Sequence, residues 1–126
     1  MRTISWFEIP TTELGRAVDF YQATLGQTLT PMSGDGTEVY VFPYAPGQTA
    51  TGGCLVRDPR HAPGAGAGTV VYFACDDLPG GLDGCLTRAA RAGGQVTLPR
   101  TAIGEHGFIG HVLDSEGNLI GLHAMA

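Results

Sequence analysis

The first element predicted by the pattern of apolar and polar residues is a β-strand over residues 3–9. Side chains alternate between the two faces of a strand, so Phe7 and Ile9 share one face. Trp6 and Glu8 share the other face. A carboxylate is costly to bury unless it is paired or protonated. Glu8 therefore indicates either a polar anchor in a cavity or a residue at the wet rim of an open sheet.

After this strand the pattern predicts a helix and three more strands. Apolar residues recur at helical spacing from Leu14 to Leu25, and Gly26 then ends the helix. Three short β-rich runs follow, separated by turns that contain glycine or proline: 27–30, 38–44 and 53–56. These elements make up a first βαβββ module over residues 1–57.

The second half of the chain repeats this plan after a linker. Residues 58–68 are rich in glycine, alanine and proline and contain nothing that could pack a core. Over residues 69–126, a β-rich run, a helix and three strand-like runs follow in the same order, and a shift of 64 residues aligns the two helices. We therefore predict an α+β fold in which residues 1–126 form a single domain of two βαβββ modules.

Several segments resemble those of the vicinal-oxygen-chelate superfamily, which has the glyoxalase/bleomycin resistance fold. FEIPTTELGRAVDFYQATLG is similar to its opening strand and helix, and VVYFACDDL and LDSEGNLIGLH are similar to its second module. The segment IGEHGFIGHVLDSEGNLIGLH is most similar to a bacterial branch described as lactoylglutathione-lyase-related. The resemblance implies that the modules form a cupped, partly open mixed β-sheet around a cavity, and that two chains pair as a homodimer.

The resemblance also implies where metal ligands would lie, and this chain departs from the pattern at those positions. The first-strand positions hold Trp6 and Val70, and the last-strand positions hold Cys54 and Gly121. The side chains of Trp, Val and Gly cannot bind a metal ion, and a lone Cys makes a poor site. We therefore predict no cofactor and no metal site of the family's kind.

Other polar residues could act in the cavity. A displaced metal site made of Glu8, His106 and His123 is the alternative to a chain without metal. Glycines flank Glu105 and His106, which is typical of a flexible loop at a cavity mouth or of a tight turn into the next strand.

Aromatic residues are expected to wall the cavity. Tyr72 is the counterpart of Glu8 in the repeat, and we predict that it faces the same cavity as Trp6. Tyr40 and Phe42 share one face of a predicted strand and are candidates to join them. Such a wall with few polar anchors is typical of a small-molecule site, although the same side chains could simply fill the barrel.

Composition narrows the choice of partners. The chain has 126 residues, 43% of them hydrophobic, which is enough for one core. Its net charge is −5 and its seven basic residues are scattered, so it has no electrostatic footprint for nucleic acid or a membrane surface. The three cysteines form no CxxC pair, which predicts buried free thiols. The first segment is unlike a signal peptide, so we expect the chain in the cytoplasm.

Three functions are compatible with these features. The first is a metal-independent protein that binds a small molecule and sequesters a drug or metabolite, as bleomycin-resistance members do. The alternative is an isomerase or lyase, metal-independent or with an atypical metal, that acts by acid–base chemistry next to a carbonyl with Glu8 and His106 as catalytic residues. A non-enzymatic accessory domain is the third and the least expected in a free-standing chain.

Overall fold

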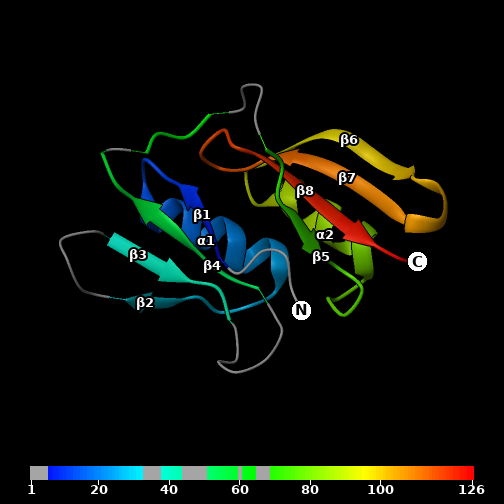
Figure 1. The fold of residues 1–126 in the computed structure, drawn as a ribbon, viewed down its shortest axis with the longest axis horizontal. Helices are drawn as coiled ribbons and strands as arrows, with labels where there is room; N and C mark the ends of the chain where they lie inside the picture. The colour runs from blue at the N-terminus through cyan, green and yellow to red at the C-terminus, as the bar shows by residue number, and fades with distance from the viewer. Residues whose placement is uncertain (1–5, 33–37, 44–50, 60, 65–68) are drawn as a thin grey trace.

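The computed structural model forms two four-stranded β-sheets that lie side by side, with a helix on one face of each (Figure 1). It describes these ranges: 6–32, 38–43, 51–59, 61–64 and 69–126. The first module contains β1 (Trp6–Pro10), α1 (Leu14–Leu25), β2 (Thr30–Met32), β3 (Glu38–Val41) and β4 (Gly52–Arg57). The second contains β5 (Tyr72–Ala74), α2 (Gly81–Arg91), β6 (Gln95–Ala102), the short 3₁₀ helix η1 (Gly104–His106), β7 (Phe108–Leu113) and β8 (Leu119–Ala124).

The two sheets have the same topology, β1-β4-β3-β2 and β5-β8-β7-β6. The first and last strands of each module pair in parallel, and the other neighbours are antiparallel. This arrangement confirms the α+β fold of two βαβββ modules. None of the helices in the described ranges is long and apolar enough to cross a membrane.

β6 is a long strand of eight residues with an irregular pairing. Its pairing with β7 continues to Ala102 through two shifts of register, between Val96 and Leu98 and between Leu98 and Thr101. Pro99 lies in the second shift and lacks the N–H that a regular ladder needs. An edge strand tolerates such a bulge, and β6 is an edge strand.

The alternation predicted for β1 is confirmed. Ile9 is buried and Phe7 packs against the core, whereas Trp6 and Glu8 are exposed. The helices cover the same side of the sheets as Phe7 and Ile9, and α1 packs against α2. The two sheets therefore share one apolar side and present an open side.

One aromatic cluster joins the two modules in the core. Tyr21, Phe7 and Phe42 come from the first module, and Phe73 comes from β5 in the second. The contacting rings have centroids 5.4–5.9 Å apart. Because such pairs add to the energy of burial, this cluster makes the core continuous between the modules.

The turn between β7 and β8 also binds the first module. A carboxylate oxygen of Asp114 accepts a 2.6 Å hydrogen bond from the hydroxyl of Tyr21, and both residues are buried. The side-chain amide of Asn118 donates to the carbonyl oxygen of Pro10 at 2.8 Å. These polar groups satisfy one another across the seam, as buried polar groups must.

Glu116 of the same turn caps the start of α1. Its carboxylate accepts hydrogen bonds from the N–H groups of Thr12 and Glu13, at 2.9 and 2.7 Å, and it pairs with Arg16 at 2.7 Å. Burial alone would raise the pKa of this carboxyl, but the hydrogen bonds from Arg16 and the backbone outweigh burial and lower the pKa to about 2. A carboxylate at a helix N-terminus also complements the helix dipole.

We expect Glu116→Gln to lower the free energy of unfolding by about 1–2 kcal/mol at pH 7, because charged hydrogen bonds are lost while the shape is kept. The lowered pKa means that the carboxylate stabilises the folded chain fully above about pH 4.5 and stops doing so as the pH falls through about 2. Urea denaturation of the parent and the variant across this range measures the effect. A difference that stays constant from pH 7 to pH 2 would contradict the assignment.

Candidate functional site

A pocket lies on the open face of the second sheet. It has a volume of about 450 Å³ and is lined by Tyr72, Ile103, Ile109 and His123. Tyr72, Ile109 and His123 come from β5, β7 and β8, and Ile103 precedes η1. We call this hollow the second-sheet pocket. Its lining combines an aromatic ring and two aliphatic side chains with one imidazole, a composition typical of small-molecule sites.

Tyr72 is positioned by a glycine and a histidine in the same row of the sheet. Tyr72 pairs with Gly121, and Gly121 pairs with His111. A Cβ on Gly121 would lie only 2.2 Å from Cδ1 of Tyr72, so the ring lies directly over the β8 backbone. Its hydroxyl reaches Nε2 of His111 at 2.7 Å, and the two rings have centroids 5.6 Å apart. The missing side chain of Gly121 is therefore what lets Tyr72 lie flat on the sheet.

His111 is a site residue that the sequence-based candidates did not include. The sequence did contain a signal for it. His111 lies on the same face of β7 as Ile109, and it is a polar residue in an otherwise apolar strand. The sequence pattern alone did not show that this face of β7 belongs to the open face of the sheet. The pairing with Gly121 and Tyr72 provides that information.

His123 reaches the backbone of η1 rather than a metal partner. Its Nε2 lies 2.6 Å from the carbonyl oxygen of His106. A carbonyl oxygen only accepts, so Nε2 carries a proton and Nδ1 is the acceptor in the neutral ring. The side chains of Glu105 and His106 are exposed, with 3.7 Å between Oε1 and Nε2. η1 thus contributes a backbone group to the pocket, while its two predicted site side chains point to solvent.

The open face of the first sheet carries Trp6 and Glu8. Glu8 pairs with Cys54, which is buried. Burial raises the pKa of the Cys54 thiol to about 11, and the charge of Glu8 adds to this shift. Trp6 is 42% exposed and pairs with Gly52. The register therefore places Glu8, not Trp6, beside Cys54.

The prediction that Tyr40 and Phe42 join the cavity wall differs from the structure. Phe42 is only 6% exposed and contacts Tyr21 in the core. Tyr40 pairs with Leu55, which is fully buried, and packs against the same core. In β3 it is Val41 that pairs with Cys54 on the open face. Because side chains alternate, Tyr40 and Phe42 must point toward the helices.

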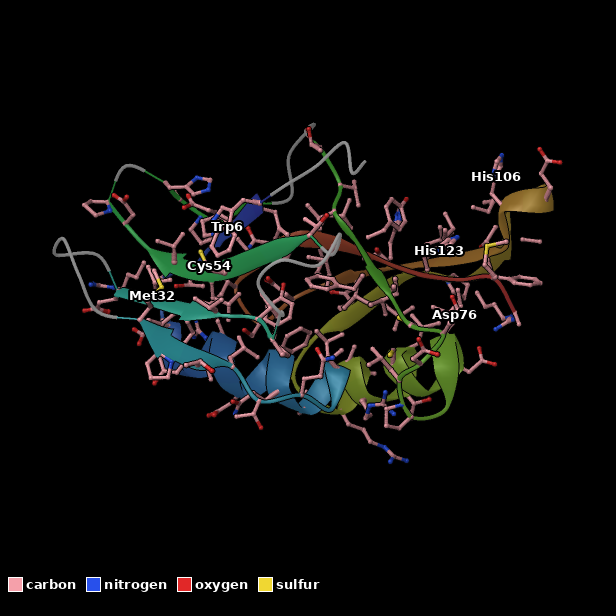
Figure 2. All side chains as sticks on the ribbon, turned by 60° about the horizontal axis from the view of Figure 1, so that its bottom comes forward. Trp6, Met32, Cys54, Asp76, His106 and His123 are labelled. Carbon is pink, nitrogen blue, oxygen red and sulfur yellow. The ribbon has the colours of Figure 1, made fainter. Side chains whose placement is uncertain are left out.

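The two predicted catalytic residues do not meet within one chain. Figure 2 shows His106 at one end of the molecule and Trp6 far from it, on β1 of the first module, and Glu8 is two residues from Trp6. In the described ranges, no three His, Cys, Asp or Glu side chains gather closely enough to hold a metal ion. The displaced site imagined from Glu8, His106 and His123 is therefore not assembled by this arrangement.

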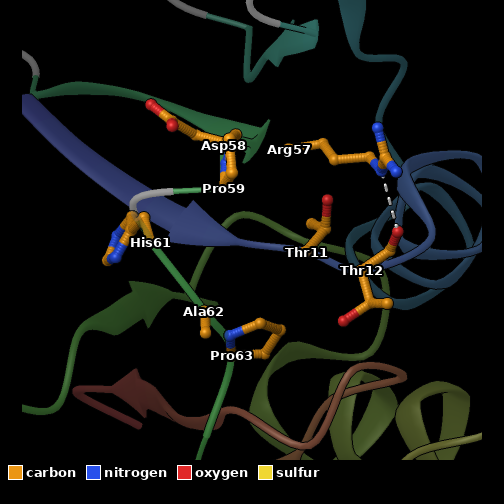
Figure 3. A pocket seen from close by; sticks show the side chains of 8 residues that line it. All are labelled: Thr11, Thr12, Arg57, Asp58, Pro59, His61, Ala62 and Pro63. Carbon is orange, nitrogen blue, oxygen red and sulfur yellow. Dashed lines mark hydrogen bonds between the residues drawn. The ribbon is translucent and has the colours of Figure 1, made fainter.

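A second hollow of about 330 Å³ lies where the linker passes β1 and β4 (Figure 3). Two of its polar side chains are engaged in internal hydrogen bonds. The Thr11 hydroxyl donates to the Val56 carbonyl oxygen at 3.0 Å, and Arg57 Nε donates to that of Thr12 at 3.2 Å. These bonds hold the chain in place. We therefore take the second-sheet pocket, with its converging rings, as the candidate site.

Comparison with known proteins agrees with this fold. The family model described as Glyoxalase/Bleomycin resistance protein/Dioxygenase superfamily matches residues 3–122. No curated protein sequence matches the chain.

Solved structures are similar to the chain over nearly its whole length. TnmS3, an antibiotic binding protein from Streptomyces sp. CB03234, is 26% identical with a TM-score of 0.69, covering 100% of this chain and 98% of that one. A glyoxalase/bleomycin resistance protein from the same strain is 25% identical with a TM-score of 0.68, covering 96% and 99%. Another, from Albidiferax ferrireducens T118, is 20% identical with a TM-score of 0.69, covering 98% of both chains.

Proposed function

Because the chain belongs to the Glyoxalase/Bleomycin resistance protein/Dioxygenase superfamily, we propose that it binds a small, largely apolar molecule in the second-sheet pocket, without a metal ion. The observation that carries this proposal is the Tyr72 ring lying over Gly121. Gly121 occupies a position at which the resemblance to the family implies a metal ligand. It has no side chain, and the Tyr72 ring covers the space that a side chain would fill.

The residues present do not fit the family's metal. Trp6, Val70 and Gly121 offer no donor atom, and Cys54 is a buried thiol whose raised pKa keeps it protonated. A divalent ion needs several nitrogen, oxygen or thiolate donors converging on one point. The proposed binding therefore needs no metal ion.

The lining suggests the chemistry of the ligand. Tyr72, Ile103 and Ile109 offer aromatic and aliphatic contacts, and His123 offers one imidazole nitrogen. A flat or branched apolar group with one or two hydrogen-bonding substituents suits this combination. An antibiotic-binding protein of the same fold, TnmS3, supports a binding role.

Native mass spectrometry of the purified chain, incubated with a library of small apolar metabolites and antibiotics, tests the proposal. We expect one library member to be retained with unchanged mass, and elemental analysis of the same sample to find far less than one divalent ion per chain. Conversion of the retained molecule would favour catalysis instead. A stoichiometric metal ion would contradict the metal-independent proposal.

We also propose that the open face pairs with a second copy of the chain. Trp6, Tyr72 and Ile103 expose 42%, 43% and 37% of their surface on or beside this face, and Met125 exposes 57% just after β8. Large apolar side chains grouped on one face favour an interface, and a two-fold homodimer is the simplest closed arrangement.

Light scattering coupled to gel filtration is expected to give about twice the 13.1 kDa chain mass at micromolar concentration. Trp6→Arg, which places a charge on the face, should shift the chain toward the monomer mass. A parent chain that is monomeric at all concentrations would contradict the pairing, whatever the outcome of the binding test.

A further inference from the structure

The ring of His123 is held against the backbone of η1. His123 lies on β8 opposite Ile109 of β7, and both side chains line the second-sheet pocket. Its Nε2 lies 2.6 Å from the carbonyl oxygen of His106 (Figure 2). Gly107 lets the end of η1 approach β8 this closely, because its φ is 95° and a Cβ there would collide with the carbonyl oxygen of Ala124. One edge of the imidazole is therefore fixed by a backbone carbonyl.

This carbonyl decides what the other ring nitrogen can do. A carbonyl oxygen only accepts hydrogen bonds, so the proton of the neutral ring is on Nε2 and Nδ1 has a free lone pair. Within the described ranges Nδ1 has no hydrogen-bond partner, yet the one buried side-chain nitrogen or oxygen without a partner is Oγ1 of Thr24. Nδ1 of the half-buried His123 is therefore accessible to solvent, on a side chain that lines the pocket.

The rest of the lining is apolar apart from one hydroxyl that is already engaged. Ile103 and Ile109 have aliphatic side chains, and the Tyr72 hydroxyl lies 2.7 Å from Nε2 of His111. Nδ1 of His123 is thus the acceptor that this lining leaves unpaired. When an apolar molecule covers such an acceptor, the lost contact with water costs free energy unless the molecule itself donates a hydrogen bond.

We propose that His123 determines the specificity of the second-sheet pocket by selecting flat apolar molecules with a hydrogen-bond donor, a phenolic hydroxyl or an aromatic N–H, directed at Nδ1. This selectivity rests on the binding role proposed above and narrows the class of ligand. A molecule of the same shape without a donor leaves Nδ1 desolvated and unpaired, and sites that present a fixed polar group reject such analogues. The Tyr72 ring and the two isoleucines provide the flat apolar contacts for either kind of molecule.

Indole and N-methylindole test the proposal, because they share one flat ring system and differ in a single donor. We expect the parent chain to bind indole about fivefold more tightly in equilibrium dialysis, the effect of one net hydrogen bond. N-methylindole is larger and more apolar, so burial alone would favour it instead. If N-methylindole binds as tightly as indole or more tightly, the selectivity is wrong while binding in the pocket stands. If neither binds, the proposed binding role fails together with the selectivity.

Phenylalanine at two histidines separates the role of Nδ1 from that of any other imidazole. His123→Phe removes both ring nitrogens and keeps a flat ring, so the preference for indole should disappear while N-methylindole still binds. His61→Phe makes the same replacement at an exposed histidine outside the second-sheet pocket, and there the preference should remain. A preference that survives in His123→Phe, or one that is lost in both variants, would contradict the assignment.

Nuclear magnetic resonance of the histidine ring nitrogens shows the tautomer of His123 directly. In the ligand-free parent chain we expect the form protonated at Nε2. Adding indole should shift the Nδ1 resonance of His123, and adding N-methylindole should leave it nearly unchanged. A ring protonated at Nδ1 in the free chain, or equal shifts with both probes, would overturn the proposal. Because this measurement uses the parent chain, it decides the question even if His123→Phe does not fold.

Discussion

Asp114→Ala is expected to lower the free energy of unfolding by about 3–5 kcal/mol, because it removes the acceptor of a buried charged network. Asp114 is only 4% exposed. One of its oxygens accepts from the Tyr21 hydroxyl at 2.6 Å, and the other from the N–H groups of Glu116 and Asn118 at 2.8 and 2.9 Å. Urea denaturation followed by circular dichroism measures the loss.

Tyr21→Phe is the matched control for this prediction. It removes only the hydroxyl and leaves Asp114 with its backbone partners, so we expect a smaller loss of about 1–3 kcal/mol. Burial and the nearby Asp114 raise the pKa of Tyr21, so its hydroxyl remains a donor at all physiological pH values. If Asp114→Ala were no more destabilising than Tyr21→Phe, the turn would not have the role in joining the modules that we assign to it.

Alanine in place of Gly53 or Gly121 is expected to change the free energy of unfolding by different amounts. A Cβ on either would overlap an aromatic ring, that of Phe7 at 2.3 Å or that of Tyr72 at 2.2 Å. Phe7 packs against Phe42 and Phe73 in the core and cannot move aside, so Gly53→Ala should lower the free energy of unfolding by about 2–3 kcal/mol.

Tyr72 is 43% exposed, so its ring can swing away from Gly121 at little cost to stability. Gly121→Ala should therefore change the free energy of unfolding by less than about 1 kcal/mol but break the bond between Tyr72 and His111 and weaken ligand binding. Thermal unfolding and nuclear magnetic resonance of the histidine rings measure the two effects. A large loss of stability in Gly121→Ala, with the His111 resonance unchanged, would show that the ring is not where we place it.

The repeated module could be predicted from sequence because its signals are local. Helical spacing from Leu14 to Leu25 and the alternation of Phe7 and Ile9 each depend on neighbouring residues only. β3 gave no such signal, since apolar residues fall on both of its faces. Tyr40 and Phe42 could therefore not be assigned to a face until the contacts of this segment with β4 were known.

The polar seam and the site depend on residues distant in the sequence. Asp114 and Glu116 look like ordinary turn residues, yet their partners are Tyr21 and the start of α1, roughly a hundred positions away. The placement of Tyr72 over Gly121 likewise depends on the register between β5 and β8. A local pattern contains no information on such a register.

The most direct test of the central claim is the affinity of the chain for the molecule that native mass spectrometry recovers, measured by calorimetry in excess chelator for the parent and for Tyr72→Ala. Our account predicts that the parent binds equally well with and without chelator. It predicts that Tyr72→Ala binds at least about tenfold more weakly, roughly 1.4 kcal/mol. Binding that chelator abolishes, or that is the same in Tyr72→Ala as in the parent, would contradict a metal-independent site built on Tyr72.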